Sequence, residues 1–249
     1  MEVTVLGTCG AYPGRGRMAS GYLLQHDGFN LVMDLGNGTM SNLQRLIDYD
    51  RIDAVLVSHS HPDHCVDLYA LFIARLFHPE PLPPLTLVTA PGVFDRISAL
   101  GSEEENIRAS FDLSEPELGE SFELGPFRIR TRPMSHWVPV MGMRIEANGH
   151  SLAYSGDTGP TPELDALARD ADMLITENSW LAGQEEGREP FHLTSRQAGE
   201  HAARAGVGHL VLSHFWPTNP REPSREQAGE AFHGELTLAE DGMALPVGP

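Results

Sequence analysis

Lysine is missing from this chain of 249 residues. All 17 basic residues are arginine, against 35 acidic ones, and the formal net charge at pH 7 is −18. Proteins that hold duplex nucleic acid or tRNA along a broad surface normally present a basic footprint. The shortage of positive charge therefore argues against large nucleic acids as partners, although bound metal ions would add a local positive patch.

Cysteine and long apolar runs are also scarce. Only Cys9 and Cys65 occur, which does not indicate a disulfide framework. No apolar run approaches the ~20 residues that a membrane span requires, and the first residues lack a basic leader with a long apolar core. We therefore expect a cytoplasmic protein without membrane association. The length suits a single domain over residues 1–249.

The absence of lysine also limits the glycine-rich stretch Gly7 to Gly14. A phosphate-binding loop of this kind ends in Gly-Lys-Ser/Thr, which this chain cannot supply. We expect the stretch to bring backbone close to a site instead.

The densest group of reactive side chains is Ser58-His59-Ser60-His61-Pro62-Asp63-His64, directly after the apolar run Asp53 to Val57. That run predicts a buried strand, with the histidines on the turn at its C-terminal end. Zinc and similar divalent ions take imidazole nitrogens and carboxylate oxygens. Pro62 suits the first turn of a helix beginning near Asp63, so Asp63 and His64 point away from His59 and His61. The pattern predicts two neighbouring metals rather than one.

More potential ligands lie late on, or just beyond, other predicted strands. These are His136, Asp157 and His214. Residues so far apart can converge only if the strand ends lie along one edge of the sheets. Asp34 ends another strand, and two roles stay open for it: a turn-capping residue, or an acceptor that orients a ligand histidine.

The order of these residues resembles the metallo-β-lactamase fold superfamily. Its hallmarks are an early Asp, H-x-H-x-D-H, a later His, a later Asp and a final His, and here they are Asp34, His59 to His64, His136, Asp157 and His214. The resemblance covers the chain as far as Trp216. It implies an α/β fold, an αββα sandwich of two mixed β-sheets flanked by helices, around a dinuclear metal site.

The resemblance also implies a division of the ligands. One metal takes His59, His61 and His136, the other takes Asp63, His64 and His214, and Asp157 bridges them. Such a pair lowers the pKa of a bridging water and clamps the attacking and leaving oxygens of an in-line displacement. We expect zinc, while the nitrogen and oxygen ligand set would also accept manganese or iron. Cys65 is expected to be a packed helix residue and not a ligand.

Within the superfamily the chain looks most like the ribonuclease Z and phosphodiesterase branch. The likeness is carried by Leu6-Gly7-Thr8, by Ala171 to Glu177 and by Phe191-His192-Leu193-Thr194-Ser195. His192 resembles the extra histidine of this branch, which contacts the scissile phosphate and donates a proton to the leaving oxygen. That role needs some imidazolium near neutral pH, beside a carboxylate such as Asp63 or Glu177. On the residues alone, the alternative interpretation is that His192 is a surface residue that precedes a helix.

The chain departs from the tRNA-processing members of the branch that it resembles. Those members carry a flexible basic arm between the counterparts of His136 and Asp157. The interval here has room for a hairpin and not for an arm. We therefore predict hydrolysis of a small phosphodiester, such as a cyclic nucleotide or a short oligonucleotide, with Asp63 and His192 as catalytic residues and Asp63 as a proton acceptor.

Three other functions stay open. They are tRNA 3′ processing with a partner subunit that supplies the arm, hydrolysis of a thioester, lactone or β-lactam, and a metal-dependent scaffold or sensor. The resemblance also suggests a homodimer. Trp137, Phe215 and Trp216 lie beside ligand positions, and both nucleobase stacking and core packing stay open for them.

Hydrophobic periodicity predicts helices over residues 41–49, 63–77, 161–169, 195–205 and 225–232. Leu76 is predicted to be buried on the second of these helices. The acidic segment 102–120 reads as the least regular part, with Glu103 to Glu105 as a solvated face, and could partly cover the site.

Overall fold

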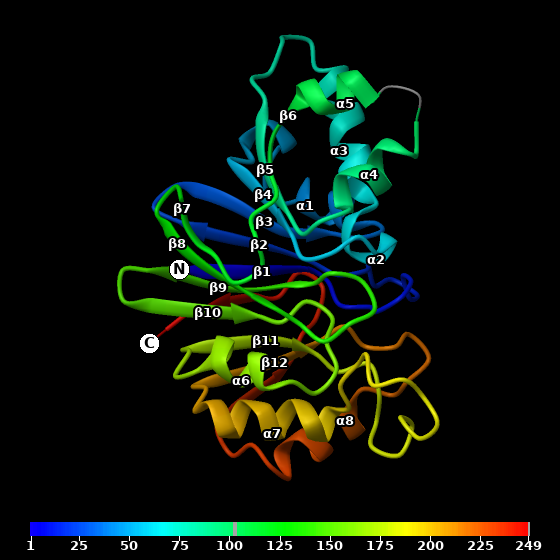
Figure 1. The fold of residues 1–249 in the computed structure, drawn as a ribbon, viewed down its shortest axis with the longest axis vertical. Coiled ribbons are helices and arrows are strands. Elements are labelled where there is room, and N and C mark those ends of the chain that lie inside the picture. Colours follow the sequence, from blue (N-terminus) through cyan, green and yellow to red (C-terminus); the bar gives the residue numbers. More distant parts are fainter. Residues whose placement is uncertain (102–103, 249) are drawn as a thin grey trace.

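In the computed structural model, which describes residues 1–101 and 104–248, two mixed β-sheets pack face to face (Figure 1). The first sheet contains β1 (Glu2–Gly7), β2 (Gly21–His26), β3 (Phe29–Leu35), β4 (Ala54–Val57), β5 (Leu85–Thr89), β6 (Phe111–Ser114) and β14 (Ala244–Pro246). The second contains β7 (Ser121–Leu124), β8 (Phe127–Pro133), β9 (Met141–Ala147), β10 (His150–Tyr154), β11 (Met173–Glu177), β12 (His209–Ser213) and β13 (Glu235–Leu238). The strand orders are β14-β1-β2-β3-β4-β5-β6 and β13-β12-β11-β10-β9-β8-β7.

Helices cover the outer side of each sheet. Those of the first half are α1 (Thr39–Leu43), α2 (Pro62–Cys65), α3 (Asp67–Leu76), α4 (Val93–Ser98) and α5 (Glu104–Ser110). Those of the second half are α6 (Pro162–Ala168), α7 (Ser195–Ala205) and α8 (Glu222–Gly229). In Figure 1, α3 to α5 lie above the first sheet and α6 to α8 below the second, which confirms the predicted αββα sandwich.

The layers follow from the alternation of side chains along the strands. β4 is buried along its whole length: Ala54 and Leu56 join the core between the sheets, while Val55 and Val57 join the core under the helices. Successive residues of a strand point to opposite faces, so a strand between two layers must be apolar throughout. This explains the unbroken apolar run before the histidine cluster.

Parallel pairing brings the strand ends together. β3 pairs with β4 in parallel, and β10, β11 and β12 run parallel in the second sheet. The carboxyl ends of neighbouring parallel strands lie at the same edge of a sheet. The residues that follow these strands therefore meet at one edge of the sandwich.

The helix predicted over residues 41–49 is wrong. α1 begins earlier and ends at Leu43, and Tyr49–Arg51 forms a short 3-10 helix. The Asp67 carboxylate accepts a hydrogen bond from the Met40 N–H at 3.0 Å, which holds the start of α1. This contact joins residues from two elements, so local periodicity does not reveal it.

Other predicted details also need correction. The helix over 63–77 is divided into α2 and α3, and Leu76 is 41% exposed instead of buried. The final helix, α8, begins earlier than predicted. Strands β6, β7, β13 and β14 are short, and their sequences alone did not predict them.

The acidic segment 102–120 is more regular than predicted. It contains α5 and β6, and β6 forms an edge of the first sheet. Ser102 and Glu103 lie outside the described residues, and none of residues 104–120 lines the cavity over the site described below. Among residues 1–101 and 104–248, no helix is both long enough and apolar enough to cross a membrane.

Candidate metal centre

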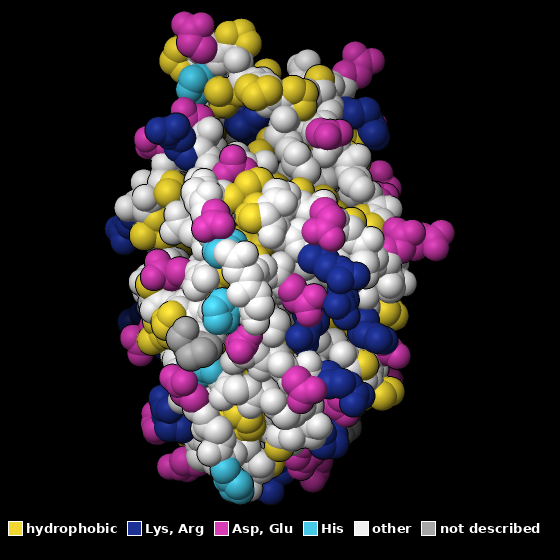
Figure 2. All heavy atoms as spheres, turned by 90° about the vertical axis from the view of Figure 1, so that its left-hand side faces the viewer, with side chains coloured by type: hydrophobic (Ala, Val, Ile, Leu, Met, Phe, Trp, Pro, Cys, Tyr) yellow, Lys and Arg dark blue, Asp and Glu magenta, His cyan; other side chains and the backbone are white. Residues whose placement is uncertain are grey.

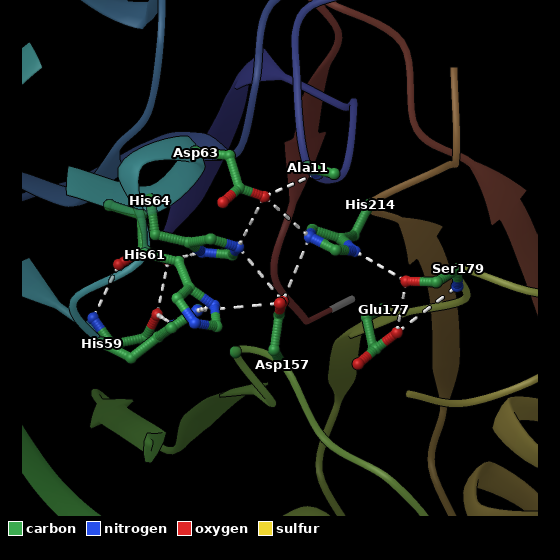
Figure 3. A network of polar contacts seen from close by, with 12 residues as sticks. Ala11, His59, His61, Asp63, His64, Asp157, Glu177, Ser179 and His214 are labelled. Atoms are coloured by element: carbon green, nitrogen blue, oxygen red, sulfur yellow. Dashed lines mark hydrogen bonds and ion pairs between the residues drawn. The ribbon is translucent and has the colours of Figure 1, made fainter. Parts of the chain in front are cut away.

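The predicted ligands come together at the edge where the parallel strands end (Figure 3). His59, His61, Asp63 and His64 follow β4, and His136 lies beyond β8. Asp157 and His214 follow β10 and β12. Residues from both sheets thus form two clusters, in each of which the potential ligand atoms lie within 4.8 Å of one another.

The first cluster contains His59, His61, His136 and Asp157. His61 Nδ1 lies 3.0 Å from His59 Nε2 and 3.3 Å from His136 Nε2. Asp157 Oδ2 lies 3.7 Å from His59 Nε2. Three imidazole nitrogens and a carboxylate oxygen therefore face one small volume.

The second cluster contains Asp63, His64, His214 and the same Asp157. Asp157 Oδ1 lies 3.1 Å from His64 Nε2 and 3.2 Å from His214 Nε2. Asp63 Oδ2 lies 3.3 Å from His214 Nε2. Figure 3 shows Asp157 between the histidines of the two clusters. Its Oδ2 faces the first cluster and its Oδ1 faces the second.

The opposite ring nitrogens are held by oxygen atoms of the protein. The pairs are His59 Nδ1 with Ser58 Oγ at 3.0 Å, His64 Nδ1 with Asp34 Oδ2 at 2.7 Å, His136 Nδ1 with the Phe191 carbonyl at 2.9 Å and His214 Nδ1 with Ser179 Oγ at 2.9 Å. Such partners fix the orientation of a metal-binding imidazole and select its tautomer. Of the two roles left open for Asp34, this geometry favours the acceptor that orients a histidine.

Asp34 is fully buried and collects several donors. It accepts hydrogen bonds from the Ser58 N–H and the Ser58 hydroxyl, each at 2.7 Å, and from the Tyr154 hydroxyl at 2.6 Å. Asp34 and His214 both have positive φ angles, 58° and 55°. Non-glycine residues adopt this conformation at a cost, and such residues cluster at functional sites.

The glycine-rich loop approaches the site with its backbone, as the sequence predicted. The Ala11 N–H donates to Asp63 Oδ2 at 2.6 Å. A Cβ at Gly10 would lie only 2.5 Å from Cε1 of His214. Composition alone did not identify Ala11 or Ser179 as site residues, because one acts through its backbone and the other only reaches His214 after folding.

Burial keeps the first three histidines uncharged. It lowers the pKa of His59 well below its ordinary value, that of His61 to about 4, and that of His136 as well. Desolvation disfavours the charged form of a buried imidazole. A divalent metal ion binds the neutral ring, so this cluster is already in the required protonation state.

The second cluster contains two buried atoms that the described residues leave without a hydrogen-bond partner of acceptable geometry, His64 Nε2 and Asp157 Oδ1. Burial opposes protonation of His64, but Asp157 and Asp63 raise its pKa well above the ordinary value. Buried polar atoms are rarely left unpaired. A cation would satisfy both atoms and replace the proton on His64, so these residues fit a pair of divalent metal ions.

His192 lies beside the clusters, between α7 and Glu177. Its Nδ1 is 2.9 Å from Glu177 Oε1, 3.3 Å from Ser179 Oγ and 3.9 Å from Asp157 Oδ2. Burial opposes charging of the ring, but the Glu177 carboxylate outweighs it and raises the pKa of His192 to about 9. The Glu177 carboxylate therefore favours the protonated form of His192.

A cavity of about 290 Å³ opens over the clusters, lined by Ala11, His61, Pro62, Asp63, Trp137, Asp157, His192, His214 and Trp216. Phe215 is only 2% exposed and belongs to the core, whereas Trp137 is 69% exposed. Cys65 is buried, and its thiol faces the His61 carbonyl oxygen at 3.2 Å. Neither metal cluster includes Cys65.

Known proteins are similar to this chain in sequence and in fold. A family model described as a beta-lactamase superfamily domain matches residues 29–215. The protein ML1173 of Mycobacterium leprae (strain TN) is 37% identical over 99% of this chain and 89% of its own length. A ribonuclease Z of Kineococcus radiotolerans is 30% identical over all of this chain and 96% of its own.

A solved structure agrees with this assignment. The metallo-beta-lactamase fold protein YhfI of Bacillus subtilis superposes with a TM-score of 0.89 at 27% identity, over 98% of this chain and 99% of that one. The matched stretch of the family model contains H-x-H-x-D-H, His136, Asp157 and His214. The chain therefore belongs to the metallo-β-lactamase fold superfamily of metal-dependent hydrolases, with relatives that include ribonuclease Z.

Proposed function

We propose that the protein is a metal-dependent phosphodiesterase that acts on small diesters. The position of His192 carries this proposal: its imidazole, held by the Glu177 carboxylate, lines the same cavity as Asp63, Asp157 and His214. Cleavage of a phosphodiester expels an alkoxide, which needs a proton. Hydrolysis of a thioester could use the same metals, but it expels a thiolate, which leaves without a proton and so has less need of this donor.

The residues that would hold the metals are the two clusters that share Asp157. Bound there, divalent ions would supply an activated water and stabilise negative charge on a phosphoryl oxygen. Zinc is the metal we propose, since the ligands are imidazoles and carboxylates.

His192 acts as the proton donor in this proposal. Because its Nδ1 is held by Glu177, Nε2 is the ring nitrogen left to reach a leaving oxygen. Asp63 acts as a metal ligand in this proposal. Burial would raise the pKa of Asp63, but His64 and His214 hold it well below its usual range. Asp63 is therefore better suited to bind a cation than to accept a proton.

The leaving group provides the test. His192→Ala in metal-loaded protein should lower kcat for a diester with an alkoxide leaving group by about 10²- to 10⁴-fold, the usual contribution of a general acid. The same change should have a much smaller effect on bis(p-nitrophenyl) phosphate, because p-nitrophenolate leaves without a proton. His214→Ala should lower both activities.

Two results would contradict the proposal. One is an inactive wild-type protein with full metal occupancy on these diesters and on a cyclic-nucleotide panel. The other is wild-type hydrolysis of a thioester, lactone or β-lactam that His192→Ala leaves unchanged.

Ribonuclease Z activity is the second candidate, because a ribonuclease Z aligns with the whole chain at 30% identity. The interval between His136 and Asp157 holds only β9, β10 and the turn at Asn148 and Gly149, with no arm. On the face drawn in Figure 2, acidic side chains are scattered over the length of the molecule, and basic ones gather mainly on one side. Cleavage of precursor tRNA by the purified protein would decide for this candidate.

Three arginines on the outer side of the second sheet share two carboxylates. Arg130 and Arg144 lie 3.2 Å and 2.7 Å from the same carboxylate, Glu146, and Arg132 pairs with Glu163 at 2.6 Å. These two carboxylates offset part of the positive charge that a phosphate backbone would need. They support the small diester over tRNA.

A further inference from the structure

All three tryptophans of the chain lie in or beside the metal cavity, in two groups. Trp180 and Trp216 pack against each other with ring centroids 4.8 Å apart, and Tyr12 meets Trp216 edge-on at 6.2 Å. Trp137 belongs to the other group and stacks on Phe191, with centroids 6.3 Å apart and planes 21° apart. Of the three tryptophans, Trp137 is exposed, whereas Trp180 and Trp216 are half-buried.

Trp137 remains 69% exposed although it is stacked on Phe191. Its ring centroid lies 5.2 Å from that of His61 and 6.1 Å from that of His136. A large aromatic ring left in water is the informative case, since folding normally buries it. Core packing, which stayed open for Trp137 on sequence, holds for Phe215 and does not account for Trp137.

We infer that Trp137 stacks the nucleobase of the substrate, so that the diester hydrolysed by this protein carries a nucleoside. This inference rests on the proposed phosphodiesterase function. Phe191 supports the indole from one side, and His61 and His136 keep the ring next to the metal clusters. One exposed indole face, backed by Phe191, suits stacking of a planar base. A quaternary ammonium group is instead recognised by several aromatic rings around it.

Two substrates with one leaving group separate base recognition from chemistry. The thymidine 5′-monophosphate p-nitrophenyl ester contains the base, and methyl p-nitrophenyl phosphate lacks it. Trp137→Ala should lower kcat/KM for the nucleoside ester by about tenfold, a value within the usual range for one stacked base. It should leave the methyl ester within about twofold, and Trp137→Phe should restore most of the loss.

A binding measurement gives a readout besides activity. Calorimetric titration should show that Trp137→Ala weakens binding of thymidine 5′-monophosphate about tenfold and leaves ribose 5-phosphate unchanged. Phe77→Ala is the matched control, because Phe77 is a similarly exposed aromatic residue, 76% exposed, that lies outside the cavity lining. It should change none of these values.

Each failure has a different meaning. Equal loss on both esters, or loss of bound metal in Trp137→Ala, would overturn the inference and make Trp137 a support for His61. Unchanged values on both esters, or selective loss with a choline phosphodiester, would also overturn it. If wild-type protein hydrolyses neither ester, the proposed function fails, and the titration still decides whether Trp137 binds a base.

Discussion

Asp157 is the residue on which both clusters depend, because one of its oxygens faces His59 and the other faces His64 and His214. Burial would raise the pKa of Asp157, yet the surrounding histidines hold it well below its ordinary value. It follows β10 on a turn where Gly156 has a φ of 59°. A Cβ at Gly156 would lie 2.9 Å from Val140 Cγ1, so this turn has little room for a larger residue.

Glu177 controls the protonation of His192 at the residue scale. Glu177→Gln removes the charge that raises the pKa of His192 to about 9, so this pKa should fall towards its ordinary value. A proton donor is lost as the pH rises through its pKa. The alkaline limb of kcat/KM on an alkoxide diester should therefore move to lower pH by more than one unit.

The control for this change is Glu163→Gln, which removes a carboxylate that pairs with Arg132 at the surface. Its pH profile should match that of the wild type. An alkaline limb that stays in place in Glu177→Gln would show that His192 is not the titrating donor.

Asp34 orients His64 and should matter for metal affinity. Asp34→Asn cannot accept every hydrogen bond now received from Ser58, Tyr154 and His64. We expect metal affinity to fall about 10- to 100-fold, measured by competition with a chelator, because partners of ligating histidines usually contribute that much. Unfolding free energy should fall by about 1–3 kcal/mol, since a buried donor is left unpaired.

Asp53→Asn is the matched control, because the Asp53 carboxylate accepts an exposed hydrogen bond from the Asn30 N–H and lies outside both clusters. It should leave metal affinity unchanged. Equal affinities in the two variants would mean that Asp34 serves the fold alone.

At the scale of elements, α7 sets the position of His192. The helix begins at a capping box in which Thr194 Oγ accepts from the Gln197 N–H at 3.2 Å and Gln197 Oε1 accepts from the Thr194 N–H at 2.9 Å. His192 lies two residues before this cap. The cap therefore fixes the chain direction at the point where the imidazole meets Glu177.

Thr194→Ala should reduce unfolding free energy by about 1 kcal/mol, because it breaks a reciprocal cap. Thr161→Ala at the start of α6 is the comparison. Thr161 accepts a single longer bond of 3.3 Å from the Glu163 N–H, so its loss should be smaller. Denaturant titration of both variants checks the order, and an equal or reversed order would contradict it.

Local patterns predicted most long elements and missed the short ones. β8 shows why prediction succeeded: Phe127 and Ile129 are buried, while Arg128 and Arg130 are exposed. β13 shows why it failed, since its four residues form a strand only through parallel pairing with β12. The pairing partner is distant in sequence, so no local pattern reveals it.

At the scale of the whole molecule, the two sheets each contribute part of the site. Its histidines have pKa values shifted in opposite directions, so the stability of the metal-free protein should fall at both low and high pH. His59, His61 and His136 have lowered pKa values, so unfolding takes up protons between their ordinary value of about 6.5 and the folded values, about 4 for His61. Stability should fall as the pH falls through this range. His64 and His192 have raised pKa values, so unfolding releases protons, and stability should fall as the pH rises from about 6.5 through the folded values, about 9 for His192.

Denaturation midpoints in the presence of a chelator, measured from pH 4.5 to 9, should therefore peak between these limbs. Added metal should raise the midpoint at neutral pH, because a ligand that binds only the folded state stabilises it. It should also weaken the alkaline limb, since a cation replaces the proton on His64. A midpoint that rises steadily up to pH 9 without metal would contradict this account.

The sequence by itself predicted the residues of the candidate metal centre and determined the layered fold. Both leave a local sequence pattern: the ligand residues directly follow apolar runs, and strands buried on both sides need unbroken apolar residues. Only the tertiary structure decided which oxygen of Asp157 faces which histidine, that Glu177 rather than Asp63 lies against His192, and that Trp137 stays open while Phe215 is buried. These outcomes depend on how two sheets meet at one edge, because the groups involved are brought together by strand pairing and not by their spacing along the chain.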